Sequence, residues 1–211
     1  MPLSCPSCDA FALTGDANNN NSPNLHCPSC NSKTDANLLP LFLITGASGA
    51  GKSTLIRHIR PLLPDCFVVG GDLLIDVTNR DRQAFLGRWL RIAYATAQCG
   101  RPLVLAGVIE KDEMETHVDR SLVGQIHVIV LSVEEQERVK RLQRRPRWAK
   151  HSDEKRSAMI AAHVGLTERL ARDADLVVKS GETDVEDAAK EVADWVKKHA
   201  VRALPSEAPA G

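Results

Sequence analysis

From residue 38 onward, short apolar runs alternate with longer stretches in which apolar residues recur every three or four positions. The apolar runs predict strands at 41–45, 66–70, 103–107, 126–131 and 175–179. The longer stretches predict helices at about 52–60, 82–98, 112–122, 133–144, 152–172 and 184–200. Such alternation is typical of a parallel sheet covered by helices on both faces. The pattern predicts an α/β domain over 38–200.

Two helix ends carry markers of their own. Gly100 and Pro102 are expected to end the helix at 82–98. The last helix is expected to open with a capping box formed by Thr183 and Glu186. Its apolar stripe includes Trp195, which we interpret as a core residue.

Residues 1–36 differ in composition from the rest of the chain and hold four of its six cysteines, Cys5, Cys8, Cys27 and Cys30. The spacing C-x₂-C-x₁₈-C-x₂-C is typical of a structural zinc site with four thiolate ligands and no open coordination position. Two disulfides, or a chance cluster of thiols, are the alternatives, but nothing in the sequence indicates secretion. We predict a zinc ribbon over 1–36, whose binding partner stays open.

The remaining composition narrows the class of protein. Lys and Arg together number 27, as do Asp and Glu, so no net charge steers the chain toward nucleic acid or an anionic membrane. No apolar run approaches the roughly 20 residues of a membrane span, so we expect a soluble, cytoplasmic protein. Cys66 and Cys99 are interpreted as small buried apolar residues, and 202–211 as a disordered tail.

A glycine-rich loop follows the predicted strand at 41–45 and carries the strongest chemical signal. It comprises Gly46, Ala47, Ser48, Gly49, Ala50, Gly51, Lys52, Ser53 and Thr54, which match G-x-x-x-x-G-K-[ST]. Glycines allow the backbone to wrap around phosphate oxygens, and amide groups at the following helix N-terminus face the anion. We expect Lys52 to reach the outer phosphates of ATP and the Ser53 hydroxyl to bind Mg²⁺.

With this loop and the strand–helix alternation, residues 38–200 resemble the P-loop kinases, which include adenylate, shikimate and gluconate kinases. The resemblance covers about three quarters of the chain and leaves the cysteine-rich segment outside. It implies a five-stranded parallel sheet and transfer of the γ-phosphoryl group of ATP to a small acceptor.

The resemblance also implies an acid after the second strand. Asp72 follows the predicted strand at 66–70, where it would face the γ-phosphate, orient or deprotonate the acceptor hydroxyl and assist Mg²⁺ binding. The carboxyl ends of strands are where open α/β sheets bind ligands. The alternative is that Asp72 caps a helix or turn. Asp76 is a weaker candidate for the same role.

Basic residues suggest two further groups of site residues. Between 138 and 150 there are seven Lys or Arg and no acid, and the resemblance implies a lid here that closes over the phosphates. Arg141 and Arg145 lie four residues apart and are the first candidates, followed by Arg144. A solvated helix face or a nucleic-acid patch is the alternative. Arg88 and Arg91, which flank Trp89, are weaker candidates for binding the acceptor, and a core tryptophan between solvated arginines is equally consistent.

One departure from the family pattern shapes the functional hypothesis. Many P-loop enzymes end the third strand with an aspartate, but 103–107 has none, and Glu110 follows three residues later. The absence argues against a motor-type ATPase. Either Asp72 takes over the metal-side role, as the resemblance to shikimate and gluconate kinases implies, or the chain is a weaker catalyst. The leading hypothesis is a kinase acting on a metabolite hydroxyl, a nucleoside or a nucleotide. The alternatives are a nucleic-acid-associated ATPase or end kinase recruited by the zinc ribbon, and a non-catalytic nucleotide sensor.

Overall fold

The computed structural model describes residues 5, 7–8, 10, 14–15, 24–35, 38–75, 81–146 and 148–200. Its centre is a five-stranded sheet in the order β5-β6-β4-β7-β8, with every neighbouring pair parallel. The strands are β4 (Leu41–Thr45), β5 (Phe67–Gly70), β6 (Leu103–Ala106), β7 (Ile126–Ser132) and β8 (Leu176–Lys179). The predicted parallel sheet is confirmed. The predicted tail at 202–211, the candidate Asp76 and Arg147 lie outside the described residues.

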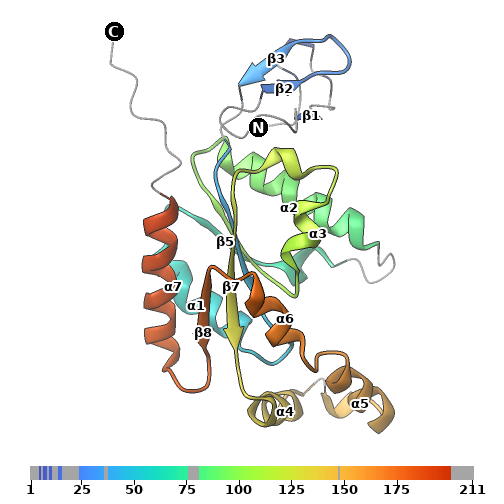
Figure 1. The fold of residues 1–211 in the computed structure, drawn as a ribbon, viewed down its shortest axis with the longest axis vertical. Helices are drawn as coiled ribbons and strands as arrows, with labels where there is room; N and C mark the ends of the chain where they lie inside the picture. The colour runs from blue at the N-terminus through green and yellow to red at the C-terminus, as the bar shows by residue number, and fades with distance from the viewer. Residues whose placement is uncertain are drawn as a thin grey trace.

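Helices cover both faces of the sheet because successive strand residues point to opposite sides (Figure 1). Phe42 and Ile44 pack with α1 (Lys52–Ile59) and α7 (Val185–Ala200). On the other face, Leu41 and Leu43 pack with α2 (Arg82–Ala97), α3 (Lys111–Glu115) lies beside it, and α6 (Leu166–Arg172) covers β7. All five residues of β4 are buried, which explains why the strand reads as a continuous apolar run.

The predicted helix at 152–172 is two helices. The helix α5 (Asp153–Ala161) ends before Gly165, which takes the left-handed conformation with φ +67° and precedes α6. The chain therefore reverses direction at a residue that tolerates positive φ. The helix α4 (Glu135–Gln143) precedes this pair, and the short 3-10 helix η4 (Trp148–Lys150) lies between α4 and α5.

Three smaller expectations are corrected. The helix expected at 112–122 ends after α3, where the Thr116 hydroxyl donates to the Asp112 carbonyl, and the 3-10 helix η3 (Arg120–Leu122) follows. The Asp184 carboxylate, rather than Thr183, accepts the Glu186 amide at 2.8 Å and opens α7. Among the cysteines, Cys99 is exposed because it lies in the turn that ends α2, and Cys66 is half-buried. The 3-10 helices η1 (Arg60–Leu62) and η2 (Gly71–Leu74) flank β5.

The cysteine-rich segment forms a separate antiparallel sheet of β1 (Thr14–Gly15), β2 (Asn24–His26) and β3 (Lys33–Asp35). We call it the ribbon. Cys5 and Cys27 are buried against Tyr94 of α2 and Leu122 of η3. The ribbon therefore sits at the edge where the parallel strands begin, at the opposite end of the molecule from α4 and α5 (Figure 1). No helix in the described part of the chain is long and apolar enough to cross a membrane.

The turn after β4 passes very close to β7, which generates the first prediction. Gly46 has φ +144°, and a Cβ at this position would lie 2.6 Å from the Leu131 carbonyl oxygen. We expect Gly46→Ala to lower the free energy of unfolding by about 2–4 kcal/mol, because backbone strain and a steric clash act together. Urea denaturation measures the change.

Gly100→Ala is the matched control, since Gly100 has φ +71° but a Cβ added there would meet no atom within 4 Å. Gly100→Ala should lower the free energy of unfolding only by the backbone strain, about 1–2 kcal/mol. Equal losses in the two variants would contradict the steric account of Gly46.

Candidate phosphoryl-transfer site

The glycine-rich loop joins the end of β4 to the start of α1 and depends on positive φ at three glycines. Gly46, Gly49 and Gly51 have φ values of 144°, 98° and 101°. Gly49 also has no room for a side chain, because a Cβ there would lie 3.0 Å from Arg138 Cγ. The helix α1 starts at Lys52, directly after Gly51. The loop thus has the strand–turn–helix setting in which backbone amides and a helix N-terminus face an anion.

Lys52 folds back over the loop and shares its surroundings with two other predicted site residues. Its Nζ donates to the Gly46 carbonyl at 2.6 Å and to the Ala47 carbonyl at 3.1 Å. Burial lowers the pKa of Lys52 to about 8, the charge of Asp72 opposes this shift, and the charge of Arg145 adds to it. The structure therefore brings Lys52, Asp72 and Arg145 within electrostatic reach of one another.

Asp72 lies in η2, immediately after β5, and is exposed. The alternative role of helix N-cap is excluded, because Gly70 holds that position and no side chain caps η2. Within the described chain, the Asp72 carboxylate takes part in no hydrogen bond or ion pair. The preceding Gly71 packs closely against β6, since a Cβ on Gly71 would lie 3.3 Å from the Ala106 carbonyl oxygen. Asp72 is thus an exposed carboxylate at the carboxyl edge of the sheet.

Arg141 lies on the side of the loop toward the end of β8 (Leu176–Lys179). Its Nη2 donates to the Ser180 carbonyl at 2.6 Å, and its Nε donates to Glu137 at 3.1 Å. The Ser180 hydroxyl in turn donates to the Ala50 carbonyl at 2.6 Å. Arg141 is therefore linked through Ser180 to the glycine-rich loop, whereas Arg145 and Arg144 are exposed beyond the end of α4.

Two further residues contact the loop and were missed by the sequence reasoning. Arg138, with 1 % of its surface exposed, pairs with Glu135 and donates from Nη1 to the Ser48 carbonyl at 3.3 Å. His163, between α5 and α6, accepts the Ser48 amide N–H on Nδ1 at 2.8 Å. Arg138 was noted only as part of a basic run. His163 belongs to no recognisable sequence motif. In the sequence around it, only Gly165, two residues later, could have indicated that the helix breaks here.

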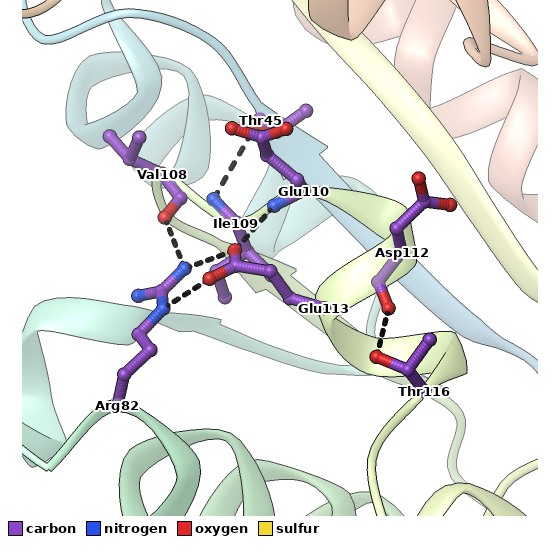
Figure 2. Close-up of polar contacts among 8 residues, drawn as sticks. All are labelled: Thr45, Arg82, Val108, Ile109, Glu110, Asp112, Glu113 and Thr116. Atoms are coloured by element: carbon purple, nitrogen blue, oxygen red, sulfur yellow. Dashed lines mark hydrogen bonds and ion pairs between the residues drawn. The ribbon is translucent and has the colours of Figure 1, made fainter.

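The loop after β6, where many P-loop enzymes place an aspartate, is held by an ion pair instead (Figure 2). Arg82 of α2 donates from Nε to Glu113 at 2.7 Å and from Nη2 to the Val108 carbonyl at 2.9 Å. Glu113 also accepts the Glu110 amide at 2.9 Å, while the Ile109 amide donates to the Thr45 hydroxyl at 3.3 Å. Burial raises the pKa of Glu113, but the hydrogen bonds from Arg82 and Glu110 outweigh burial and leave that pKa lowered.

The two candidate acceptor-binding arginines lie further along α2. Arg91 pairs with Asp119 at 2.9 Å and so ties α2 to the start of η3. It stands nine residues beyond Arg82, or about 13 Å along the helix axis. Arg88 is half-buried beside the core residue Trp89. The role of Arg88 and Arg91 in acceptor binding stays a prediction, and the structure gives Arg91 a partner within the fold.

Comparisons with known proteins agree with this geometry at the level of the fold. No protein-family model and no curated protein matches the sequence. An APS kinase from Mycobacterium tuberculosis, solved with AMPPNP and APS, is 19 % identical, with a TM-score of 0.56 over 76 % of this chain and 99 % of that chain. The chain has the fold of the P-loop kinases.

Two other solved structures share this P-loop kinase fold. A gluconokinase from Sinorhizobium meliloti is 17 % identical, with a TM-score of 0.54 over 78 % of this chain and 95 % of that chain. A shikimate kinase from Acinetobacter baumannii is 18 % identical, with a TM-score of 0.51 over 76 % of this chain and 94 % of that chain. These similarities establish the fold of the chain. Its chemistry must be inferred from its own residues.

The ribbon adds a candidate metal centre to the P-loop kinase fold. The sulfur atoms of Cys5, Cys8, Cys27 and Cys30 lie within 4.8 Å of one another. The Cys5–Cys30 and Cys8–Cys27 sulfur distances are 3.5 and 3.6 Å. Four thiolates around Zn²⁺, with bonds of about 2.3 Å, require sulfur separations of about 3.8 Å, whereas a disulfide requires about 2.05 Å. The four thiols fit zinc and do not form disulfides.

Neighbouring groups favour the thiolate form at two of the four cysteines, Cys5 and Cys30, whereas the adjacent thiols raise the pKa of Cys8. The Ser32 hydroxyl lies 3.0 Å from Cys5 Sγ and 3.1 Å from Cys30 Sγ. Its hydrogen bond lowers the pKa of the Cys5 thiol to about 6 and also lowers the pKa of Cys30. The Ser7 amide donates to Cys5 Sγ at 3.3 Å.

We expect the purified protein to carry one zinc ion per chain, measured by elemental mass spectrometry. Cys8→Ser should lose the metal and lower the thermal midpoint, because a structural zinc site supplies folding free energy. Cys99→Ser, which changes an exposed cysteine outside the cluster, should retain both. Full zinc content in Cys8→Ser would contradict the four-thiolate site.

Proposed function

We propose that this protein is an ATP-dependent kinase that transfers the γ-phosphoryl group to a small acceptor hydroxyl with the help of Mg²⁺. The observation that carries the proposal is the meeting of Lys52, Asp72 and Arg145 at a glycine-rich loop of P-loop geometry. A phosphate-binding ammonium, an exposed carboxylate and a long guanidinium side chain are the charges that phosphoryl transfer uses.

The loop would bind the nucleotide. Lys52 would leave the Gly46 and Ala47 carbonyls and reach the β- and γ-phosphates, where an ammonium neutralises charge. Ser53, exposed in the first turn of α1, would offer its hydroxyl to Mg²⁺. Arg141, held by Ser180 beside Gly51, would lie on the side of the loop away from Asp72, along the nucleotide rather than at the acceptor.

Asp72 and Arg145 would act on the transferred group. The acceptor oxygen attacks the γ-phosphorus, the bond between that phosphorus and the leaving oxygen of ADP breaks, and Asp72 takes the acceptor proton. Arg145, with Arg144 beside it, would stabilise the negative charge on the phosphoryl oxygens. Asp72 suits this role because it is exposed, caps no helix and is close enough to interact with Lys52.

The class of acceptor is a small molecule in this proposal. The neighbours with this fold are named for APS, gluconate and shikimate, all of which are small hydroxyl-bearing compounds. A panel of nucleosides, nucleotides, sugars, hydroxy acids and adenylyl sulfate, assayed for acceptor-dependent ADP formation, tests the proposal. Nucleotide binding without ADP formation from any acceptor would favour the nucleotide sensor instead.

Asp72→Asn should lower the turnover number by at least about a hundredfold and change the ATP dissociation constant less than about threefold, because a general base acts on the acceptor and not on nucleotide binding. Asp65→Asn is the matched control, since Asp65 is an exposed carboxylate just before the other end of β5. Steady-state kinetics and nucleotide titration measure the two effects. Equal turnover in both variants would remove Asp72 from the mechanism.

Lys52 makes nucleotide affinity dependent on pH. Its pKa of about 8 means that the ammonium is increasingly deprotonated above that pH, and binding must then take up a proton. We expect ATP affinity to fall as the pH rises from about 8 to about 10, as measured by titration calorimetry with Mg²⁺ present. Lys52→Arg keeps its charge throughout this range and should abolish the fall, even if its overall affinity is lower. A wild-type affinity that stays constant over this pH range would exclude this role.

A further inference from the structure

Both backbone polar groups of Ser48 are bound by side chains from outside the glycine-rich loop. The Ser48 carbonyl accepts from Arg138 Nη1 at 3.3 Å, and the Ser48 amide donates to His163 Nδ1 at 2.8 Å. Arg138 is almost completely buried, so water does not compete for its hydrogen bonds. The backbone of Ser48 is therefore held at two points, one on α4 and one between α5 and α6.

The same two residues attach the α5 segment, residues 153–163, to the site. No residue of α5 is buried. Arg138 Nη2 donates to the Ile160 carbonyl near its end at 3.1 Å, and His163 comes shortly before Gly165, the left-handed residue that opens α6. A helix with so little packing is positioned largely by these polar contacts.

We propose that His163 is a positioning residue for nucleotide binding: its neutral imidazole, acting with Arg138, fixes the Ser48 backbone and so couples the phosphate-binding loop to the α5 segment. The inference rests on the proposed function, since the loop must bind a nucleotide for the coupling to matter. It needs Nδ1 to be an acceptor, which requires an unprotonated ring with its hydrogen on Nε2.

The charges around His163 favour the neutral ring. Arg138 and Glu135 face it from α4, and Lys52 faces it from α1. Burial lowers the pKa of His163, Arg138 and Lys52 lower that pKa further, and Glu135 opposes them. Protonation would place two N–H donors opposite each other at Ser48, so the hydrogen bond is present above the lowered pKa and is lost as the pH falls through it.

Three variants separate the acceptor from the rest of the side chain. His163→Ala removes the acceptor, and we expect it to weaken Mg-ATP binding about three- to tenfold at a pH of about 8, the effect of one net hydrogen bond. His163→Asn places an amide oxygen close to the position of Nδ1 and should restore wild-type affinity. His151→Ala removes a histidine that directly follows η4 and, within the described chain, makes no hydrogen bond to the loop, so this variant should bind like wild type.

The pH profile distinguishes positioning from direct phosphate contact. Below the pKa of His163 the wild type should bind more weakly than His163→Asn, and the two should converge at a pH of about 8, where the imidazole is neutral. Comparison of the two proteins cancels the ionisation of ATP itself. Tighter acid binding by the wild type would show an imidazolium contacting phosphate directly, and would overturn the proposal.

A second readout needs no nucleotide. In an NMR titration below a pH of about 7, the Ser48 amide signal should follow the protonation of His163 in the wild type and stay constant in His163→Asn. Lys52, which donates to the adjacent Ala47 carbonyl, changes charge only near a pH of about 8. Absence of nucleotide binding in the wild type would refute the proposed function, and the Ser48 titration would still decide the His163 contact. An invariant Ser48 signal, or an alanine variant that is folded by circular dichroism and binds as tightly as wild type, would overturn the inference.

Discussion

The buried guanidinium of Arg138 is the constraint on which the phosphate-binding end of the molecule depends. A charge removed from water is tolerated only when its donors are filled, and Arg138 fills them with Glu135, the Ser48 carbonyl and the Ile160 carbonyl. These partners belong to α4, to the glycine-rich loop and to α5, so the three segments must meet. The aliphatic part of the Arg138 side chain also explains why residue 49 is glycine, because a Cβ there would meet Arg138 Cγ. The loop sequence and α4 are therefore interdependent.

The helix α2 joins the two ends of the sheet. At its first residue, Arg82 and Glu113 hold the loop after β6, beside the candidate site. Three turns later, Tyr94 packs against the cysteines of the ribbon. Between these points Leu86, Trp89 and Leu90 bury the helix against the sheet. A structural change in the ribbon would therefore reach α2 at the end that lies away from the glycine-rich loop. This placement fits a structural role of the ribbon better than a role in the chemistry.

The sheet could be predicted because its three central strands, β4, β6 and β7, are covered on both faces and read as apolar runs. The glycine-rich loop and the cysteine spacing could be predicted because backbone geometry and metal ligation restrict residue type. The contacts of Ser48 with His163 and of Ser180 with Ala50 could not, since they join residues 115 and 130 positions apart. The pattern of apolar residues within a short window carries no information on pairs so far apart in the sequence. The same pattern predicted one helix at 152–172 and missed the break at Gly165.

The sheet order clarifies what the missing aspartate at the end of β6 means. The strand β6 lies between β4, which leads into the loop, and β5, which leads to Asp72. Where β6 ends, the Val108 carbonyl accepts from Arg82, the Ile109 amide donates to Thr45, and the nearby Glu113 carboxylate is paired with Arg82. The strand β5, which leads to Asp72, lies two strand spacings from β4, or about 10 Å. The acid next to the end of β6 is thus engaged in the ion pair with Arg82, and in the proposed kinase reaction the exposed Asp72 carboxylate would be the acid available to the acceptor.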